Sequence, residues 1–482
     1  MQKKRTLSLL LALILLGSSF VSCSDATTDE TAPDTQAAAN PSAAETEETE
    51  FSILSTLPEY TFNGDTVSML SKVDSWWQYI SINAEEISGE TINDAIYNRN
   101  LAFMEAYDTT LSIIDYEGSC TNLVRQAVSA GDSTYDVVLP SMNDGAAMVN
   151  EDIILNLHDI STIDLSNPAW DQNASDYYSI AGKLYYGVSD ISLGKNEAAW
   201  LYMFNKRLLD EYQLEDPYTL VREDKWTFDK TLEFMAVASN DTNGNGEPDE
   251  GDRFGLATHD VNYYALLISA GQPMAGKNYE ENVPFMNASN ESFVKVYDKI
   301  VEYFTDEKQT VMEYEGETFM AGNALLCGQV IACVRLFREM EDDFGIVPTP
   351  KFDEAQEQYY TYVIPYDVYA CAVPVSVLDP ERSGIIMQAM AIYSMECLTP
   401  AYYDITITGK GLRDEDSAEM LDLILSSTVY DLARMYDWGA FASGLPKNIH
   451  NKRDFTSSYK RKSKMIEGEL QKTIETYNNN IN

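Results

Sequence analysis

Short apolar runs alternate with longer amphipathic stretches in the region that follows residue 61. Residues 66–71, 109–116 and 135–139 are short and rich in large apolar side chains, which is typical of buried strands. Apolar residues recur at helical spacing between the first two runs, and again over residues 119–130. Strands that alternate with helices predict a mainly parallel sheet with helices on its faces.

The ends of these two helices carry capping signals. Thr91 is expected to cap the first helix, with Asp94 completing a capping box, and Gly131 ends the second helix at the position where glycine is favoured. Ligands of such sheets gather beyond the carboxyl ends of the strands. We therefore expect a binding site around residues 71–77 and 140–144.

A second α/β unit is expected to begin after the turn at residues 167–170. Residues 200–205 are a strong strand candidate, whereas the β-rich segment 362–373 is interrupted by Pro365, which suits an edge or crossover strand. Helical periodicity marks four further stretches: residues 206–212, 226–238, 292–304 and 456–477. A body of this size exceeds a single core, so two domains are expected.

The N-terminus has the pattern of a secretion signal. A basic group at residues 3–5 precedes an almost wholly apolar run over residues 7–16, which is too short to cross a bilayer as a permanent helix. The residues that follow, up to Cys23, resemble a bacterial lipobox. The resemblance implies a signal peptide over residues 1–22 and acyl chains such as palmitate on Cys23; plain cleavage with an ordinary cysteine is the alternative.

Residues 23–60 are expected to form a disordered acidic tether. The stretch 24–50 contains acidic residues but no Lys or Arg, and no large apolar residue occurs in it. Such a segment cannot bury enough surface to offset the entropy lost on ordering. We interpret it as a spacer between the lipidated cysteine and the folded body.

Charge and cysteine content narrow the class of protein. The formal net charge is −44, from 77 acidic and 33 basic residues, which argues against nucleic acid because clustered Lys and Arg bind phosphates. We interpret the acidity as a solvated surface. The five cysteines after Cys23 have irregular spacing and predict no disulfide framework. They are expected to be small buried apolar residues: Cys120, Cys327, Cys333, Cys371 and Cys397.

Several stretches of the body together resemble the extracellular solute-binding proteins of bacterial ABC importers, in the family 1-like branch that includes many sugar binders. These stretches are residues 86–100, 135–142, 182–188, 202–206, 344–351, 399–403 and 436–439. The resemblance implies an α/β fold of the two-lobed, type II periplasmic-binding-protein kind, with a hinge and an interlobe cleft.

The resemblance also implies a domain division and a function. Lobe 1 would comprise residues 61–165 and 366–405, and lobe 2 residues 166–365 and 406–482. The implied function is capture of a small solute, a sugar or oligosaccharide, by hinge closure, followed by docking on ABC permease subunits. We expect an extracytoplasmic monomer that is lipid-anchored to the cell membrane and is not an enzyme.

Residues 241–252 have the spacing of a calcium loop, just before a strand expected at residues 253–256. Oxygen-bearing side chains stand at positions 1, 3, 5, 9 and 12, position 7 can supply its backbone carbonyl, and glycine at position 6 allows the sharp turn. The predicted ligands of a structural Ca²⁺ are Asp241, Asn243, Asn245, Glu247, Asp249 and Asp252. A surface turn without metal is the alternative.

A sugar site needs aromatic platforms beside carboxylates and amides, because sugars present apolar faces and a rim of hydroxyls. The chain has 31 Tyr and 6 Trp, which is more aromatic surface than a core requires. The candidate ligand-binding residues are Asp74, Trp76, Trp77, Ser141, Asn143, Asp190, Tyr366 and Trp438. For each one alone, core packing or surface display is the alternative interpretation.

Two other functions stay open. A secreted glycoside hydrolase would use two carboxylates, and so acidic a chain always offers a pair, so composition gives this function no specific support. The three histidines lack metal-ligand spacing, and no nucleophile elbow, metalloprotease motif or phosphate loop is present. The other alternative is a glycan-binding surface protein that serves no importer.

Overall fold

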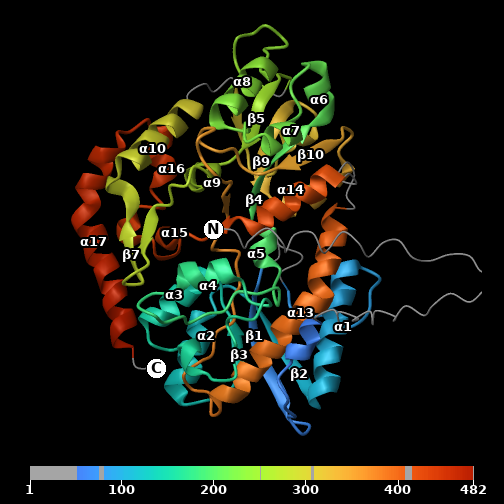
Figure 1. The fold of residues 1–482 in the computed structure, drawn as a ribbon, viewed down its shortest axis with the longest axis vertical. Coiled ribbons are helices and arrows are strands. Elements are labelled where there is room, and N and C mark those ends of the chain that lie inside the picture. The colour runs from blue at the N-terminus through green and yellow to red at the C-terminus, as the bar shows by residue number, and fades with distance from the viewer. Residues whose placement is uncertain (1–51, 75–80, 250, 305–308, 408–414, 481–482) are drawn as a thin grey trace, which may run out of the picture. The chain divides into compact units, whose positions relative to one another are not determined.

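Three parallel strands form the first sheet, in the order β2-β1-β3 (Figure 1). They are β1 (Thr66–Val73), β2 (Thr110–Glu117) and β3 (Val137–Leu139). Met69 of β1 pairs with Ile113 of β2 on one side and with Val137 of β3 on the other. The predicted parallel sheet is confirmed, and we call the part of the molecule built on it lobe 1.

The computed structural model describes residues 52–74, 81–249, 251–304, 309–407 and 415–480. These residues belong to one compact unit, so the predicted lobe boundaries stay a prediction. Cys23, the signal peptide and most of the predicted tether lie outside the described residues, as do Trp76 and Trp77.

Four helices pack around the first sheet in pairs, α1 with α13 and α2 with α3 (Figure 1). They are α1 (Thr91–Tyr107), α2 (Thr121–Ala130), α3 (Met142–Asn150) and α13 (Pro380–Ile407). Residues 383–394 of α13 are all buried, because the helix is covered on every side at this point. Two short 3-10 helices also belong here, Ile53–Thr56 and Leu157–Asp159.

The first turn of α1 is capped one residue earlier than predicted. Glu90, and not Thr91, is the N-cap, and its carboxylate accepts a 2.7 Å hydrogen bond from the backbone N–H of Asn93. The Asp94 carboxylate turns back to the preceding loop instead of completing a capping box. Helix α2 ends as predicted at Gly131, whose φ of +67° is the left-handed conformation that glycine tolerates.

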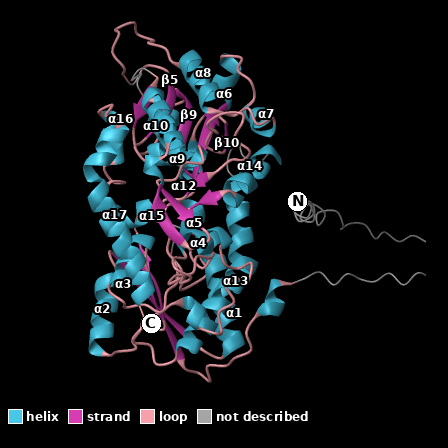
Figure 2. Ribbon diagram, turned by 60° about the vertical axis from the view of Figure 1, so that its left-hand side comes forward, coloured by secondary structure: helices cyan, strands magenta, loops and turns pink. Residues whose placement is uncertain are grey.

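Five strands form the second sheet, in the order β10-β4-β9-β5-β8. Strands β5, β9 and β10 of this sheet are labelled in Figure 2. They are β4 (Trp200–Asn205), β5 (Phe254–Thr258), β8 (Thr310–Met312), β9 (Ala324–Val330) and β10 (Phe344–Val347). Strand β5 is parallel to β8 and β9, whereas β4 runs antiparallel to β9 and β10. Strand β4 is entirely buried and coincides with the predicted strand at residues 200–205. We call the part built on this sheet lobe 2.

The helices of lobe 2 include three that were predicted from periodicity and several that were not. They are α6 (Lys206–Glu211), α7 (Pro217–Arg222), α8 (Phe228–Ala238), α9 (Asn262–Ser269), α10 (Glu291–Tyr303), α11 (Glu317–Met320), α12 (Ala332–Leu336), α14 (Glu415–Ser426) and α16 (Leu445–His450). A hairpin of β6 (Ala275–Asn278) and β7 (Val283–Met286) and the 3-10 helices Asn287–Ser289 and Phe337–Glu339 complete it. The predicted helices 206–212, 226–238 and 292–304 are confirmed, with ends shifted by one or two residues.

The chain crosses between the two sheets at short, irregular elements. They are α4 (Gln172–Tyr178), α5 (Gly194–Glu197), β11 (Thr361–Tyr362), β12 (Thr428–Val429), α15 (Leu432–Tyr436) and the 3-10 helix Trp438–Ala440. The segment after β11 makes isolated bridges to lobe 1, between Tyr369 and Ser141 and between Ala372 and Val138. These bridges to lobe 1 confirm the crossover predicted for residues 362–373.

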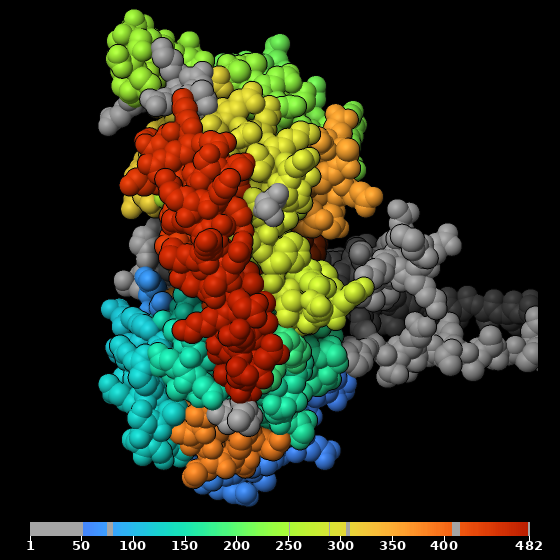
Figure 3. Space-filling model, turned by 90° about the vertical axis from the view of Figure 1, so that its left-hand side faces the viewer, coloured from blue at the N-terminus to red at the C-terminus, as the bar shows by residue number. Residues whose placement is uncertain are grey.

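The long C-terminal helix α17 (Phe455–Asn479) contacts both lobes and forms a continuous ridge on one face of the molecule (Figure 3). Near its start, the ring of Phe455 packs 4.8 Å from the ring of Tyr297 on α10. Beyond its other end, the side-chain amide of Asn480 donates a 3.0 Å hydrogen bond to the carbonyl of Val149 on α3. The helix predicted at residues 456–477 is confirmed.

The five cysteines of the described residues form no disulfide. Cys120, Cys327, Cys333 and Cys371 are buried as predicted, whereas Cys397 on α13 is only half-buried. In the part of the chain that the structure describes, no helix is both long enough and apolar enough to cross a membrane.

Candidate ligand-binding site

Side chains from three strand ends of lobe 2 come together. His259 and Asp260 follow β5, Tyr314 follows β8, and Gln329 lies at the end of β9. The carboxyl ends of neighbouring parallel strands meet at one edge of a sheet, where α/β proteins bind ligands. The His259 imidazole stacks on the Tyr314 ring with centroids 4.9 Å apart, and its Nε2 lies 3.3 Å from Oε1 of Gln329. The ring of Trp200 also contacts the imidazole in an edge-to-face arrangement, with centroids 5.0 Å apart.

Asp260 presents a carboxylate beside these rings. Its Oδ1 accepts a hydrogen bond of 3.5 Å from the Tyr314 hydroxyl and lies 3.7 Å from Nδ1 of His259. Hydrogen bonding from His259 is the main cause that lowers the pKa of Asp260, and the positive charge of Arg434 contributes to the same direction. Because 43% of its side chain is exposed, the carboxylate can accept further hydrogen bonds.

Arg434 on α15 lies among tyrosines at the junction of the lobes. Its guanidinium carbon is 3.9 Å from the ring centroid of Tyr264 and 5.0 Å from that of Tyr366. Its Nε donates a 3.2 Å hydrogen bond to the hydroxyl of Tyr362. We call the three tyrosines around the guanidinium, Tyr264, Tyr362 and Tyr366, the cage. Arg434 is 4% exposed, whereas Tyr366 is 40% exposed, so Tyr366 forms the side of the cage that faces solvent.

Lobe 1 brings the ends of its own strands to the same junction. Lys72 and Asp74 lie at the end of β1, and the Nζ of Lys72 stands 5.7 Å from the ring centroid of Tyr369 on the crossover. Asn143 in the first turn of α3 donates a 3.0 Å hydrogen bond to the carbonyl of Met435, beside Arg434. The polar groups of the two lobes are therefore connected through α15.

A carboxyl group with a raised pKa lies on the crossover between the lobes. Burial, followed by the negative charge of Asp74, raises the pKa of Asp367 to about 7, against the opposing effect of Lys72. Asp367 follows Tyr366 directly in the chain. The junction therefore contains a group whose charge changes near neutral pH.

No model of a known protein family matches the sequence, and no curated protein matches it. Solved structures do match. An ABC substrate-binding protein from Listeria monocytogenes in complex with cycloalternan shares 12% identity, covering 86% of this chain and 99% of that one, with a TM-score of 0.54. This chain has the two-lobed fold of solute-binding proteins.

Other solute-binding proteins agree over a similar extent. UgpB from Mycobacterium tuberculosis, in complex with glycerophosphocholine, shares 13% identity over 85% of this chain and 99% of that one, with a TM-score of 0.55. RafE from Streptococcus pneumoniae shares 12% over 88% of this chain and 99% of that one, with a TM-score of 0.53. At such identities the likeness establishes the fold, and the expected α/β, type II periplasmic-binding-protein-like architecture is confirmed.

Within the solute-binding fold, three of the predicted ligand residues lie at the junction. Tyr366 covers Arg434, Asn143 bonds to the carbonyl next to it, and Asp74 is exposed at the end of β1. These positions are compatible with ligand contact, which stays a prediction for each of them.

Three other predicted residues are engaged in holding the fold together. Ser141 is 2% exposed, and its hydroxyl caps α3. Asp190 lies 3.2 Å from Nζ of Lys195. The indole of Trp438 is 3% exposed and donates a 2.9 Å hydrogen bond to Oγ1 of Thr473 on α17. We therefore give these three residues no part in the proposed ligand site.

Sequence reasoning missed His259, Asp260, Tyr314 and Arg434. A strand was expected at residues 253–256, so the rule used for lobe 1, that ligands gather at strand ends, also points to His259 and Asp260. Arg434 has no comparable signal, because the tyrosines around it come from segments far apart in the chain.

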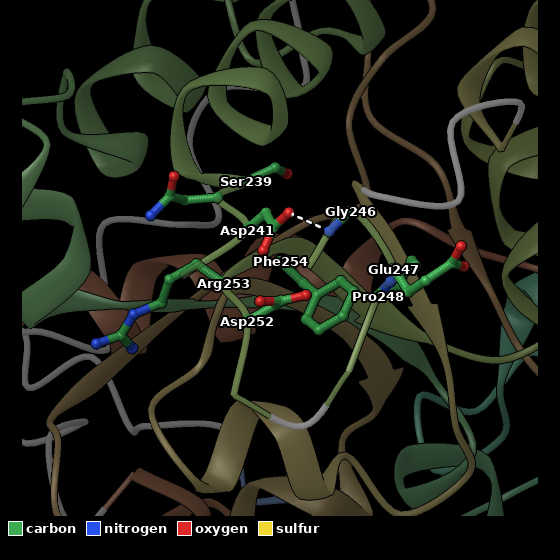
Figure 4. Close-up of a pocket in the computed structure, with 9 residues that line it drawn as sticks. Ser239, Asp241, Gly246, Glu247, Pro248, Asp252, Arg253 and Phe254 are labelled. Carbon is green, nitrogen blue, oxygen red and sulfur yellow. Dashed lines mark hydrogen bonds between the residues drawn. The ribbon is translucent and has the colours of Figure 1, made fainter. Parts of the chain in front are cut away.

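The loop at residues 241–252 has local hydrogen bonds that arrange its carboxylates (Figure 4). The two oxygens of Asp241 accept hydrogen bonds of 2.7 Å each from the backbone N–H groups of Gly244 and Gly246. Asp252, only 4% exposed, accepts from the backbone N–H groups of Thr242 and Asp249 at 3.0 and 3.1 Å. Gly246 has a φ of +83°, as the sharp turn requires.

The remaining predicted calcium ligands contact each other. The side-chain amides of Asn243 and Asn245 donate to Oδ2 of Asp249 at 2.6 and 2.7 Å, and Glu247 is exposed. Among the described residues, no group of three or more His, Cys, Asp or Glu side chains is arranged to hold a metal ion. The oxygen donors fit Ca²⁺ by type, since it prefers carboxylate, amide and carbonyl oxygens, and calcium binding stays a prediction.

Two hollows lie beside this loop, apart from the group of residues around Arg434. The loop itself lines a small one of about 100 Å³. A larger one of about 530 Å³ has mostly apolar walls that include Phe254, Tyr263, Phe304 and Met312. Neither hollow is lined by a residue from the strand ends of lobe 1, so neither is a site between the two lobes.

Proposed function

We propose that this chain is the extracytoplasmic solute-binding component of an ABC importer and that it captures a small sugar or oligosaccharide. The observation that supports the proposal most is the group formed by His259, Asp260, Tyr314 and Arg434 at the strand ends of lobe 2, next to the strand ends of lobe 1. Solute-binding proteins of this fold include some in complex with cycloalternan, maltotriose and α-D-tagatose.

Asp260, Tyr314 and Arg434, together with Tyr366 beside Arg434, would have distinct parts in capture. The exposed faces of Tyr314 and Tyr366 suit the apolar face of a sugar ring, and the Asp260 carboxylate suits its hydroxyls. Arg434 is fixed by tyrosines before any ligand arrives, so little side-chain entropy is lost on binding. Hinge closure would then bring Asp74 and Lys72 of lobe 1 to the other side of the ligand.

Binding assays on the full chain test this proposal. Maltotriose, α-D-tagatose and glycerophosphocholine are the first probes, with calorimetry and thermal shift as readouts. For any probe that binds, Asp260→Asn and Tyr314→Ala should each weaken binding about tenfold or more, because each change removes about 1.5 kcal/mol or more of contact. The matched controls Asp229→Asn and Tyr279→Ala change exposed residues elsewhere and should leave affinity unaltered. Equal losses in variants and controls would contradict the assignment.

A binding role also predicts that the ligand is returned unchanged. Solved proteins with this fold are binding proteins of transporters, and this supports a protein that is not an enzyme. Long incubation of the purified protein with a bound oligosaccharide, followed by mass spectrometry, separates the two functions. Shortened products would favour the glycoside hydrolase alternative.

The lipid anchor is proposed from the sequence pattern that ends at Cys23. Two acyl chains add about 0.8 kcal/mol per buried CH₂, which is enough to hold the protein at the membrane. Replacement of Cys23 by Ala should prevent palmitate incorporation and release the protein from the membrane fraction. Absence of palmitate from the wild type would argue for plain signal cleavage, and retention of the unlabelled variant at the membrane would argue for another means of attachment.

Calcium in the 241–252 loop is proposed as a structural cation. Support comes from the spacing of the oxygen donors and from the Asp241 carboxylate, which already accepts the backbone N–H of Gly246. Asp241, Asn243, Asn245, Asp249 and Asp252 would supply side-chain oxygens, and Glu247 its carbonyl. The ion would fix the loop that leads into β5.

A further inference from the structure

Arg434 is a buried cation that forms no ion pair in the described part of the protein, although its charge acts on Asp260 and Asp431 at longer range. It is 4% exposed, and no carboxylate among the described residues forms an ion pair with it. Its only hydrogen bond to another described side chain runs from Nε to Tyr362. Burial of an unpaired charge costs free energy, so an anion that pairs with this guanidinium would stabilise it.

The two carboxylates on which the charge of Arg434 acts have other hydrogen-bond donors. Asp431 lies three residues before Arg434, but its two oxygens accept the backbone N–H groups of Met274, Ala275 and Ala433 at 2.8 to 3.1 Å. Asp260 accepts a hydrogen bond from the Tyr314 hydroxyl and lies 3.7 Å from Nδ1 of His259. Asp431 is therefore engaged with the backbone, and neither aspartate forms an ion pair with the guanidinium.

The cage leaves the hydrogen-bonding end of the arginine available. The rings of Tyr264 and Tyr366 lie against the guanidinium at 3.9 and 5.0 Å, which stabilises its charge without using its N–H groups. The two terminal nitrogens have no hydrogen-bond partner among the described residues. They are also not among the unpartnered polar atoms that solvent cannot reach, so a ligand can reach them. Two N–H groups side by side in a fixed plane match the two oxygens of a carboxylate or phosphate.

We propose that the solute carries an oxyanion that Arg434 binds, so that the ligand is an acidic sugar such as a uronate or a sugar phosphate. This inference rests on the proposed solute-binding function and specifies its ligand class. The sugar ring would lie on the exposed face of Tyr366, and the oxyanion would form the direct ion pair that Arg434 lacks in the described part of the protein. Arg434 would then distinguish acidic from neutral sugars, because a neutral sugar leaves the cation unpaired.

Matched pairs of ligands test the inference on the full chain. Calorimetric titrations compare D-galacturonate with D-galactose, D-glucuronate with D-glucose, and glucose 1-phosphate with methyl glucoside. We expect at least one acid to bind tenfold or more tightly than its neutral partner. The pair that shows this preference also separates a carboxylate from a phosphate.

Substitutions assign the preference to the arginine. Arg434→Met should lower the affinity for the acid tenfold or more and leave the neutral partner nearly unchanged, and Arg434→Lys should restore part of the preference. The control Arg222→Met alters an exposed arginine on α7 that pairs with Glu419, and it should change neither affinity. Because Arg434 is buried, Tyr366→Ala serves as a second variant: it removes the exposed ring and should also weaken binding of the acid.

The outcomes separate this inference from the proposed function. If a neutral sugar binds as tightly as its acid, or if Arg434→Met keeps the preference, the inference is overturned while solute binding stands. If none of the acids binds, the inference is likewise overturned. Mass spectrometry of the small molecule released from natively purified protein gives an independent check, since an acidic solute supports the inference and a neutral solute opposes it.

Discussion

The hydroxyl of Tyr477 near the end of α17 lies 2.9 Å from the hydroxyl of Tyr186, next to the segment that bridges to the crossover. The hydroxyl of Tyr436 lies 2.8 Å from Tyr477 on the other side. Tyr186 and Tyr477 are buried, so these three groups bond to one another in place of water. The C-terminal helix is therefore fixed, by polar contacts as well as by packing, to the segment around Tyr186 that bridges to the crossover.

We expect Tyr477→Phe to lower the free energy of unfolding by about 1 kcal/mol, because the buried Tyr186 hydroxyl and the half-buried Tyr436 hydroxyl lose their shared partner and keep only a 3.4 Å contact with each other. Urea unfolding followed by circular dichroism measures this change. Tyr459→Phe, on the same helix, is the control, since its hydroxyl has no hydrogen bond within the described ranges. Equal stability of the two variants would contradict the role given to the hydroxyl group.

The buried ion pair of Arg335 and Glu197 gives a larger effect. Nη1 of Arg335 lies 2.5 Å from Oε1 of Glu197, whose side chain is fully buried. Arg335→Met leaves an unpaired carboxylate in the interior and should cost about 3 to 5 kcal/mol in unfolding free energy. The double variant Arg335→Met with Glu197→Gln should recover part of this loss. A loss below about 1 kcal/mol would mean that the pair is solvated.

Asp367 should make stability depend on pH in a defined window. Its pKa is raised from the model-compound value of 3.8 to about 7, so the folded state binds the proton more tightly than the unfolded state. The stabilising contribution of the protonated group is therefore complete below about pH 4 and is lost as the pH rises through 7. Melting temperatures between pH 4 and 8 should show this fall in the wild type and a smaller fall in Asp367→Asn. Parallel profiles would rule out Asp367 as the source.

Calcium should raise the melting temperature if the 241–252 loop binds it. At a concentration one hundred times the dissociation constant, binding to the folded state alone adds about 2.7 kcal/mol. Asp241→Ala and Asp252→Asn should remove the shift, and EDTA should reverse it in the wild type. If titration with Ca²⁺ produces no heat and leaves the melting temperature unchanged, the 241–252 loop does not bind calcium.

Much of the fold follows from local patterns in the sequence. Strand β4 and helices α2, α8 and α10 were predictable because the apolar residues of each follow a single spacing and capping or turn residues lie at their ends. Helix α13 was not, because residues 383–394 are buried on every side and therefore show no amphipathic stripe. The cap of α1 was misplaced by one residue, since Glu90 and Thr91 can each accept a backbone N–H.

The candidate site was less predictable than the fold. Tyr366 and Asn143 could be found from strand ends and the crossover, whereas Trp438 looked like a sugar platform and is in fact covered by α17. Arg434 depends on rings from α9, β11 and the crossover, which only the folded chain brings together. A local pattern cannot reveal which side chains share a junction.

The attachment of α17 to both lobes restricts the kind of motion available for loading and unloading. A straight helix attached at both ends keeps its two attachment points at a constant separation. The crossover segments connect the same two lobes at another place. Rotation about the helix is then easier than wide separation of the lobes. Ligand exchange would proceed by a twist, and spin labels placed on α2 and α8 should report a change of direction larger than the change of distance.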